Sequence, residues 1–232
     1  MFQYFKMADI KALQRAHPDY MTMFQELTDS SKSREEVTAA YDKWSNYEEI
    51  IKMYAPNRQL VGSKAFEAEF GNKNRDIKIL DAGAGTGLAA EELVKLGFTN
   101  IDALEPCETL AKQAMQKNIY KKWYKAYMCK DRLPIDDNVY DIIYSVGVFA
   151  PGQARADALE ELMRILKPGG HIMIITGEGY LVHPHMVNFE PRIAELEKEG
   201  ILIRRKRDTV PHYSADESGP MNGVALVLQK PL

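Results

Sequence analysis

The residues best suited to chemistry lie in one short stretch, ILDAGAGTGLA, at residues 79–89. Its acid is followed by glycines that alternate with small residues: Asp81, then Gly83, Ala84, Gly85, Thr86 and Gly87. Glycine-rich turns bind anionic groups through their backbone N–H groups, but an acid at the mouth of this turn repels a phosphate. The stretch therefore predicts a ligand with an ammonium group near Asp81 and a carboxylate near the turn amides. An amino acid joined to a nucleoside has both groups.

The same turn departs from the dinucleotide-binding fingerprint G-x-G-x-x-G. Gly83 and Gly85 match its first two glycines, but Leu88 occupies the third position. That third glycine allows the helix to pack closely on the strand in dinucleotide sites. A nicotinamide-dependent oxidoreductase is therefore the least favoured function.

Further residues complete a predicted nucleoside site. Glu105 stands 22 positions after Gly83, where an acid accepts hydrogen bonds from ribose hydroxyls. Pro106 can lie against an adenine face. Asp131 can accept the adenine amino group, and Leu133 can contact the ring. Together with the glycine turn, these residues describe S-adenosyl-L-methionine.

Strands that alternate with helices must position these residues. Strands are predicted at 77–80, 101–105, 123–128, 140–146, 171–176, 201–207 and 224–229. Helices are predicted at 87–96, 108–117, 153–167 and 191–200. This alternation predicts an α/β fold, a doubly wound, Rossmann-like sheet of seven mainly parallel strands. Ligands bind such sheets at the carboxyl ends of the strands.

The chain divides near residue 75. Residues 1–74 carry only helical signals and are predicted to form an N-terminal helical cap, whereas residues 75–232 form the core. In the cap, SREE at 33–36 has the spacing of a capping box. An apolar stripe then predicts one helix as far as Ile51, followed by a shorter helix at 62–70.

Two aromatic residues of the first cap helix are candidates for contact with the cofactor. Tyr41 and Trp44 stand at helical spacing, a pattern that is as typical of core packing as of a binding site. An aromatic face beside a sulfonium cation contributes about 0.5–2 kcal/mol. Tyr41 is the stronger candidate because its hydroxyl can also donate to the ligand's carboxylate.

Four motifs appear in a specific order between residues 75 and 177: LDAGAGTG, ALEPCETL, KDRLPIDDNVYDIIYSVGVF and RILKPGGHIMI. With these motifs the chain resembles class I S-adenosylmethionine-dependent methyltransferases. YDKWSNYEE before the core and GVFAPGQARADALEELMRILKPGG within it are similar to the methyltransferase-like protein 27 family. The resemblance implies a cofactor held by Gly83, Gly85, Glu105 and Asp131, with the YDKW helix as a lid.

The methyl acceptor is expected at the ends of the fourth and fifth strands. Ser145, counted with the cofactor site, begins the stretch to Phe149 that should form the pocket wall with Tyr180 and the lid. His183 and His185 are candidates for a general base. A zinc site is not expected, because the sequence near this pair offers no further ligands.

Composition narrows the choice of partners and location. The formal net charge is -3, which disfavours nucleic acid as the partner. The basic run at 204–207 is expected on a solvated strand edge. The sequence has no apolar run long enough to cross a membrane, and residues 1–17 do not have the pattern of a signal peptide. Two cysteines fit a reduced, cytoplasmic protein, with the nucleus left open.

The sequence therefore predicts a methyltransferase whose acceptor, a small molecule or a protein side chain, is unidentified. The alternative is a regulatory or scaffold protein that binds S-adenosylmethionine without catalysis, because the predicted residues all bind rather than react. Oligomeric state is not predicted.

Overall fold

The computed structural model describes residues 19–44, 47–55, 57–216 and 219–232 of the chain. Residues 1–17, whose sequence does not have the pattern of a signal peptide, lie outside the described residues. Seven strands form one sheet: β1 (Ile79–Ala82), β2 (Ile101–Leu104), β3 (Trp123–Tyr124), β4 (Tyr140–Val146), β5 (Leu166–Gly177), β6 (Ile203–Asp216) and β7 (Gly219–Gln229). Their order is β3-β2-β1-β4-β5-β7-β6. The first five strands are parallel, and β7 runs antiparallel to both β5 and β6. The predicted fold class is confirmed.

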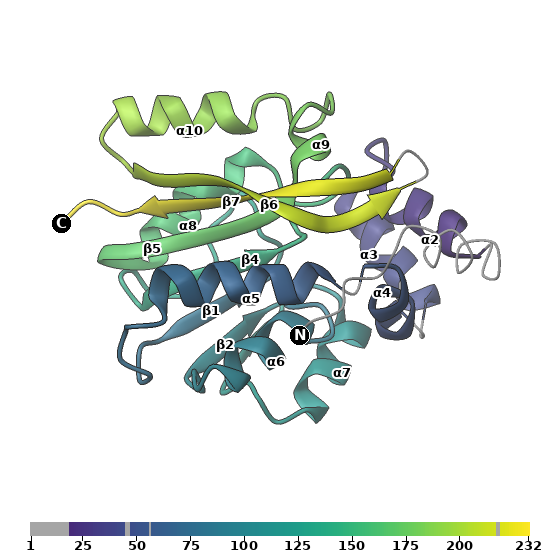
Figure 1. Ribbon diagram of the computed structural model, residues 1–232, viewed down its shortest axis with the longest axis horizontal. Helices are drawn as coiled ribbons and strands as arrows, with labels where there is room; N and C mark the ends of the chain where they lie inside the picture. The colour runs from purple at the N-terminus through teal and green to yellow at the C-terminus, as the bar shows by residue number, and fades with distance from the viewer. Residues whose placement is uncertain (1–18, 45–46, 56, 217–218) are drawn as a thin grey trace.

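Helices cover both faces of the sheet (Figure 1). They are α2 (Asp19–Thr28), α3 (Arg34–Lys43), α4 (Tyr47–Tyr54), α5 (Asn57–Phe70), α6 (Leu88–Lys95), α7 (Glu108–Gln116), α8 (Leu159–Ile165), α9 (Glu178–Leu181) and α10 (Phe189–Lys198), with a 3₁₀ turn at Ala156–Ala158. Figure 1 shows α2, α3 and α4 grouped at one end of the sheet, whereas α5 lies along it. The cap region and the core are therefore joined through α5.

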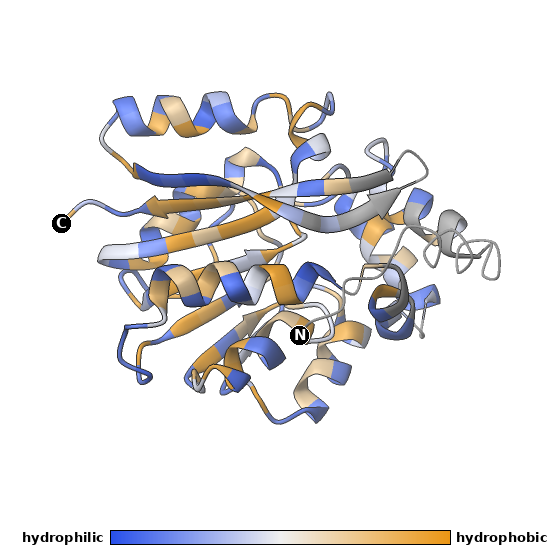
Figure 2. Ribbon diagram, viewed as in Figure 1, coloured by the Kyte–Doolittle hydropathy of each residue, from blue (hydrophilic) through white to orange (hydrophobic). Residues whose placement is uncertain are grey.

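Each face of the sheet has its own core. On one face, α5 and α6 pack through Phe66, Phe70 and Leu93 against strand residues such as Ile142. On the other face, α8 and α10 pack against the alternate strand residues, such as Ile143. Figure 2 accordingly shows largely hydrophobic central strands beside helices that carry hydrophilic residues. Burial on both faces explains why the central strands are nearly continuous apolar runs.

The cap region differs from the prediction in the helix expected as far as Ile51 and in α5, which begins at Asn57 rather than at residue 62. The predicted capping box is present: Ser33 N–H donates to Glu36 Oε2 (2.8 Å), and Glu36 N–H donates to Ser33 Oγ (3.2 Å). The single helix predicted as far as Ile51 is instead two helices. Helix α3 ends at Trp44, whose φ of -106° and ψ of 68° are not helical. The prediction of one helix was wrong because the apolar spacing continues across this break.

Several core strands differ from their predicted bounds: β3 is shorter, whereas β5, β6 and β7 are longer. The prediction of a strand at 123–128 was too long, because the ladder with β2 ends at Tyr124. Ala126 N–H then donates to Tyr124 O (3.2 Å), so the chain turns away from the sheet. The predicted helix at 153–167 is shorter in the structure, and β5 begins earlier, at Leu166. Residues 126–128 are thereby free to leave the sheet edge.

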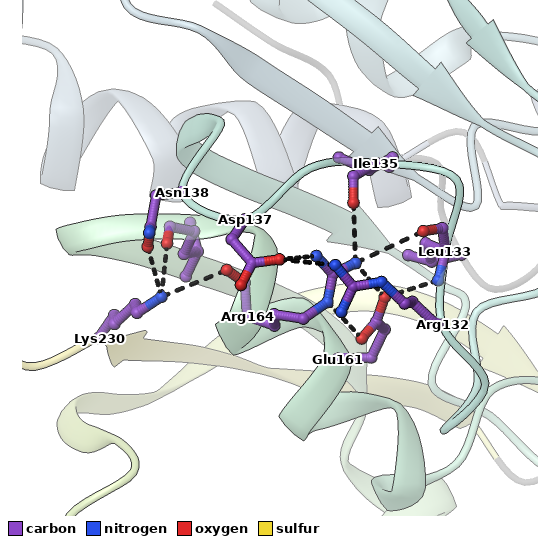
Figure 3. Close-up of polar contacts among 9 residues, drawn as sticks. Arg132, Leu133, Ile135, Asp137, Asn138, Glu161, Arg164 and Lys230 are labelled. Atoms are coloured by element: carbon purple, nitrogen blue, oxygen red, sulfur yellow. Dashed lines mark hydrogen bonds and ion pairs between the residues drawn. The ribbon is translucent and has the colours of Figure 1, made fainter.

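The loop between β3 and β4 is held by an arginine on α8 (Figure 3). Arg164 donates to Glu161 Oε2 (2.8 Å) and to Ile135 O (2.9 Å), and it also pairs with Asp137. Glu161 in turn accepts from Leu133 N–H (2.6 Å). Burial raises the pKa of Glu161, but the hydrogen bonds from Arg164 and Leu133 outweigh it and hold that pKa below its usual value. The loop is therefore fixed to α8 by a largely buried ion pair.

We expect Arg164→Met to lower the free energy of unfolding by about 2–4 kcal/mol, because it leaves the Glu161 carboxylate buried without its partner. Urea denaturation measures the loss. Arg132→Met is the matched control, since Arg132 pairs with the same Asp137 but its side chain is 68% exposed, and it should cost less than about 1 kcal/mol. Equal losses in the two variants would contradict a structural role specific to Arg164.

Candidate functional site

The glycine turn after β1 has a backbone that requires glycine. Gly83, Gly85 and Gly87 have φ values of +80°, +54° and +88°, in the region that side chains disfavour. A Cβ on Gly83 would stand 2.4 Å from Val148 Cγ2, so this glycine allows β1 and the end of β4 to approach. A Cβ on Gly85 would meet no atom within 4 Å. The turn is therefore packed at Gly83 and open at Gly85.

The amide groups of this turn already have acceptors within the protein. Gly83 N–H and Ala84 N–H donate to Leu104 O at 2.8 and 3.1 Å, and Gly85 N–H donates to Glu105 Oε2 at 2.9 Å. These bonds fasten the turn to the end of β2. The expectation that the turn amides bind a ligand carboxylate finds no support at these three residues.

Glu105 lies at the carboxyl end of β2 and is 7% exposed. Its Oε1 accepts from Cys107 N–H (2.8 Å), while Oε2 accepts from Gly85 N–H. Burial raises the pKa of Glu105 to about 7, against the opposing effect of these two hydrogen bonds. Each carboxylate oxygen has a second lone pair, so both can still accept a hydrogen bond from a ligand.

Asp81 lies in β1, two residues before Gly83, and is 1% exposed. Tyr120 O–H donates to its Oδ2 at 2.6 Å. Its Oδ1 is buried and has no hydrogen-bond partner among the described residues. Burial raises the pKa of Asp81 to about 6, although the bond from Tyr120 lowers it. A buried acceptor without a partner is costly, which makes Oδ1 a candidate for a ligand or water contact.

A cavity opens at the carboxyl ends of β1, β2 and β4. Six of the predicted site residues line it: Tyr41, Gly83, Ala84, Gly85, Glu105 and Pro106. Sequence reasoning missed other lining residues, among them Arg58, Gln59, Leu110, Tyr127, Met128 and Gln153. Tyr127 and Met128 reach the cavity because β3 ends early. The sequence carried no periodic signal for these residues, since their placement follows from tertiary contacts.

Three further predicted residues lie near the site without lining the cavity. Asp81 is in β1 directly before the glycine turn, and Gly87 ends the turn as the N-cap of α6. Ser145 is fully buried in β4, where its Oγ donates to Ala82 O (2.8 Å). We therefore assign Ser145 to fixing the β1–β4 pair, rather than to direct contact with a ligand.

The structure places three other predicted residues away from the cavity. Asp131 has a side chain that is 74% exposed and stands 3.9 Å from Arg34. Leu133 is buried in the core. The Trp44 indole N–H donates to Glu26 Oε2 (3.3 Å). For these residues, direct contact with adenine or a sulfonium stays a prediction that their placement does not favour.

The predicted acceptor wall is present in part. Val146, Gly147 and Val148 line the cavity, whereas Phe149 is buried in the core against Phe189. Tyr180 lies outside the lining and packs near Gly177. The wall therefore comes from the three residues at the end of β4 and the helices before β1.

The histidine pair lies beyond α9, away from the cavity lining. His185 N–H donates to His183 Nδ1 at 3.2 Å. Burial and the nearby Arg155 lower the pKa of His185. Within the described part of the chain, no group of three His, Cys, Asp or Glu residues could hold a metal ion. In the same part, no helix is long and apolar enough to span a membrane.

Comparison with known proteins finds similarity to methyltransferases over part of the chain. Residues 80–174 match the methyltransferase domain family. Methyltransferase-like protein 27 of Homo sapiens is 24% identical over 162 residues, which are 69% of this chain and 66% of the human protein. The chain thus covers slightly less than two thirds of that relative's length.

Solved structures share the fold. A chain in the complex of the Haloferax volcanii Trm112 methyltransferase activator with a methyltransferase has a TM-score of 0.63 and 18% identity, covering 83% of this chain and 98% of that one. An S-adenosylmethionine-dependent methyltransferase from Aquifex aeolicus has a TM-score of 0.55 and 21% identity, covering 78% and 97%. The chain therefore shares a methyltransferase domain over residues 80–174 and the fold of these solved structures. It is similar to methyltransferase-like protein 27.

We expect the buried Asp81 to make the stability of the ligand-free protein depend on pH. Its pKa is about 6 in the folded protein, against 3.8 for the ordinary group, so the folded state binds more protons between these values. The free energy of unfolding should therefore fall as pH rises from 4 to 6. The Asp81→Asn variant lacks this titrating group. Its free energy of unfolding, relative to that of wild type, should therefore rise by about 2–3 kcal/mol from pH 4 to pH 7.

Urea denaturation at several pH values measures this difference. Asp131→Asn is the control, because that acid is largely exposed. Wild type and Asp81→Asn curves that stay parallel across this range would contradict burial of an ionisable Asp81.

Proposed function

We propose that this protein transfers a methyl group from S-adenosylmethionine to an acceptor that is not yet identified. The observation that carries the proposal is the Glu105 carboxylate, buried at the end of β2 and lining the cavity beside Gly85. An acid at this point of a doubly wound sheet suits the two hydroxyls of a ribose. The alternative is a protein that binds the cofactor at this same site without catalysis. It would bind S-adenosylmethionine but transfer no methyl group.

The residues present fit the cofactor. The gap over Gly85 leaves room for close approach of a ligand to the backbone. The buried Oδ1 of Asp81 can accept from an ammonium group through water. We propose that Glu105 binds the ribose, that Tyr41 lies beside the sulfonium, and that Pro106 contacts the adenine.

The adenine end is proposed to involve residues other than Asp131. Leu110 and Met128 line the cavity together with Pro106, and their apolar side chains suit the faces of a purine. Tyr127, in the same lining, supplies a hydroxyl that already accepts from Thr38 Oγ1 at 3.1 Å. The recognition of adenine is therefore proposed to rest on apolar contact, with Asp131 at the solvent side.

The bound cofactor supplies an electrophilic methyl group on a positively charged sulfur. The chain's own contribution is to orient the partners and exclude water, which can lower a barrier by about 7–11 kcal/mol. Val37 and Ile51 from the cap and Val146 and Val148 from β4 and its end give the cavity apolar walls. These walls favour a partly desolvated acceptor beside Tyr41.

Residues 1–74 are proposed to act as a lid over residues 75–232. Several side-chain contacts besides Thr38–Tyr127 join the described part of the lid to the core. Among them, Asp42 accepts from Thr109, and Glu48 pairs with Lys117 at 2.8 Å. These polar contacts hold α3 and α4 against the core beside the cavity. Opening of the lid would admit ligands without unfolding the sheet.

The surface of β6 supports the proposal of a partner other than nucleic acid. Arg204 pairs with Glu197 (3.7 Å), and Arg207 pairs with Glu190 (2.7 Å). The basic run is thus locally neutralised. Cys107 and Cys129 are free thiols, which supports a reducing, cytoplasmic location.

Calorimetry tests the proposed cofactor. Wild type should bind S-adenosylmethionine and S-adenosylhomocysteine but not NAD. Glu105→Ala should weaken binding of S-adenosylhomocysteine by at least about tenfold, since hydrogen bonds to a charged group contribute about 1.5–3 kcal/mol. Asp131→Ala is the matched control and should change the affinity by less than about threefold.

Two outcomes of this experiment would contradict the proposal. If neither sulfur nucleoside binds, the cofactor is wrong. If Glu105→Ala binds as wild type does, the ribose assignment is wrong. Transfer of labelled methyl to components of a cell extract then separates an enzyme from a binding protein, and Asp81→Ala should abolish that transfer.

The Tyr41 ring should attract the positively charged sulfur of the cofactor. The sulfur of S-adenosylmethionine is positively charged, whereas that of S-adenosylhomocysteine is not. Because an aromatic ring attracts a cation, we expect Tyr41→Ala to weaken binding of S-adenosylmethionine more than binding of S-adenosylhomocysteine. The ratio of the two dissociation constants should change by about 2–30-fold. Trp44→Ala, at a residue outside the cavity lining, should leave the ratio unchanged. A ratio that moves equally in both variants would show that Tyr41 has no specific contact with the sulfonium.

A further inference from the structure

Two cavities meet where α4, α5 and α6 come together. The cavity at the carboxyl ends of the strands, called the site cavity below, has a volume of about 140 Å³, and a second one, called the side cavity, has a volume of about 430 Å³. Gln59 of α5 and Leu88 of α6 line both cavities. On α4, Ile51 lines the site cavity, and the next residue, Lys52, lines the side cavity. These four side chains therefore form the partition between the two cavities.

The side cavity carries balanced charges of both signs. Its charged lining residues are two lysines, Lys52 and Lys95, and two glutamates, Glu91 and Glu92. S-adenosylmethionine has a zwitterionic amino-acid end and a polar nucleoside, so a passage with charges of both signs is complementary to it. An apolar molecule would gain nothing from this lining.

One lysine holds α4 across the partition. Lys117, directly after α7, lies 2.8 Å from Glu48 of α4 and 2.8 Å from Glu91 of α6. The side chains of Lys117 and Glu48 are each 18% exposed, and Lys52 pairs with the same Glu48. Burial raises the pKa of Glu48, but hydrogen bonds from Lys117 and Lys52 outweigh it and hold that pKa below its usual value. The ion pair is therefore fully charged at neutral pH.

The helices on the two sides of this ion pair are packed differently. Helices α5 and α6 belong to the core of the sheet through Phe66 and Leu93. Helix α4 is joined instead to α3, because Tyr47 N–H donates to Trp44 O (2.9 Å) and the rings of Tyr41 and Tyr47 lie edge to face, 5.3 Å apart. An outward movement of α4 would therefore carry α3 with it and leave α5 and α6 in place.

We propose that the side cavity is the entrance through which S-adenosylmethionine reaches the site cavity, and that the Glu48–Lys117 ion pair is the latch that closes it. When α4 moves outward, Ile51 and Lys52 leave the partition, and the two cavities join between Gln59 and Leu88. The proposal rests on the proposed function of the site cavity. Because the latch stabilises the closed state with and without ligand, breaking it should change rates rather than affinity.

Surface plasmon resonance with S-adenosylhomocysteine measures the association and dissociation rate constants separately. Glu48→Gln should raise both by about 2–5-fold, the factor by which a partly exposed ion pair stabilises one state over another. The dissociation constant should stay within about twofold of wild type, because the two rate constants rise together. Adding Lys117→Met to Glu48→Gln should give little further increase, since both changes remove the same contact.

Glu190→Gln is the matched control for the latch. Glu190 of α10 pairs with Arg207 of β6 at 2.7 Å, and the two side chains are 34% and 36% exposed. This ion pair also joins two elements, but both residues lie outside the lining of the site and side cavities. Its loss should leave both rate constants unchanged.

Leu60→Trp tests the route itself. Leu60 lines the side cavity but not the site cavity, so an indole there should narrow the entrance without touching the bound ligand. Both rate constants should fall by at least about threefold, with the dissociation constant within about twofold. Ala68→Trp is the control on the same helix, because Ala68 lines a different cavity that shares no lining residue with the site cavity.

The Cys107 thiol reports on the latch without any ligand. It is 1% exposed and lies 3.5 Å from Asp42 of α3, so outward movement of α3 and α4 would expose it. In protein that carries Cys129→Ala, Glu48→Gln should raise the rate of alkylation of Cys107 by iodoacetamide by about 2–5-fold. Glu190→Gln should leave that rate unchanged.

Three results would overturn the proposal. Rate constants that Glu48→Gln leaves unchanged, or a rise in the dissociation rate constant alone, would rule out the latch. Rate constants that Leu60→Trp leaves unchanged, in protein that melts as wild type does, would rule out the side cavity as the entrance. If wild type binds no sulfur nucleoside, the proposed function fails instead, and an unchanged alkylation rate in Glu48→Gln would then rule out the latch on its own.

Discussion

The arrangement of the site depends on one buried carboxylate. Glu105 accepts N–H groups from Gly85 and Cys107, and so joins the glycine turn after β1 to the start of the segment that leads into α7. With Gly83 and Ala84 bonded to Leu104 O, the ends of β1 and β2 are fixed to each other. Burial raises the pKa of Glu105 to about 7, so keeping this carboxylate ionised at the end of β2 costs free energy.

The site also depends on the helical segment that precedes the sheet. Helices α3, α4 and α5 supply Tyr41, Tyr47 and Arg58 to a cavity whose floor comes from the strand ends. The contacts from Thr38 to Tyr127 and from Glu48 to Lys117 are polar and partly exposed. Such contacts are weaker than core packing. The proposed movement of the lid would therefore involve α3 and α4, because α5 packs in the core of the sheet.

The parts of the site that follow from local sequence were predictable. The strand ends and the glycine turn could be predicted because burial on both faces makes the strands apolar, and because positive φ values require glycine. Glu105 could be predicted from its spacing of 22 positions after Gly83. Contact of Asp131 and Leu133 with the cofactor stays a prediction. Their loop is fixed by Arg164 on α8, which no local pattern reveals. Trp44 was grouped with Tyr41 because the helix break between α3 and α4 does not interrupt the apolar spacing. Glu48 and Lys117 meet only through tertiary structure, so spacing could not indicate them.

A crystal structure of the protein with S-adenosylhomocysteine tests the central claim most directly. The account predicts that both ribose hydroxyls lie within about 2.5–3.0 Å of the Glu105 carboxylate oxygens, the range for hydrogen bonds between hydroxyl and carboxylate oxygens. The sulfur should lie beside Tyr41, in the cavity between the ends of β1 and β4. A nucleoside bound elsewhere, or ribose hydroxyls that face away from Glu105, would contradict it.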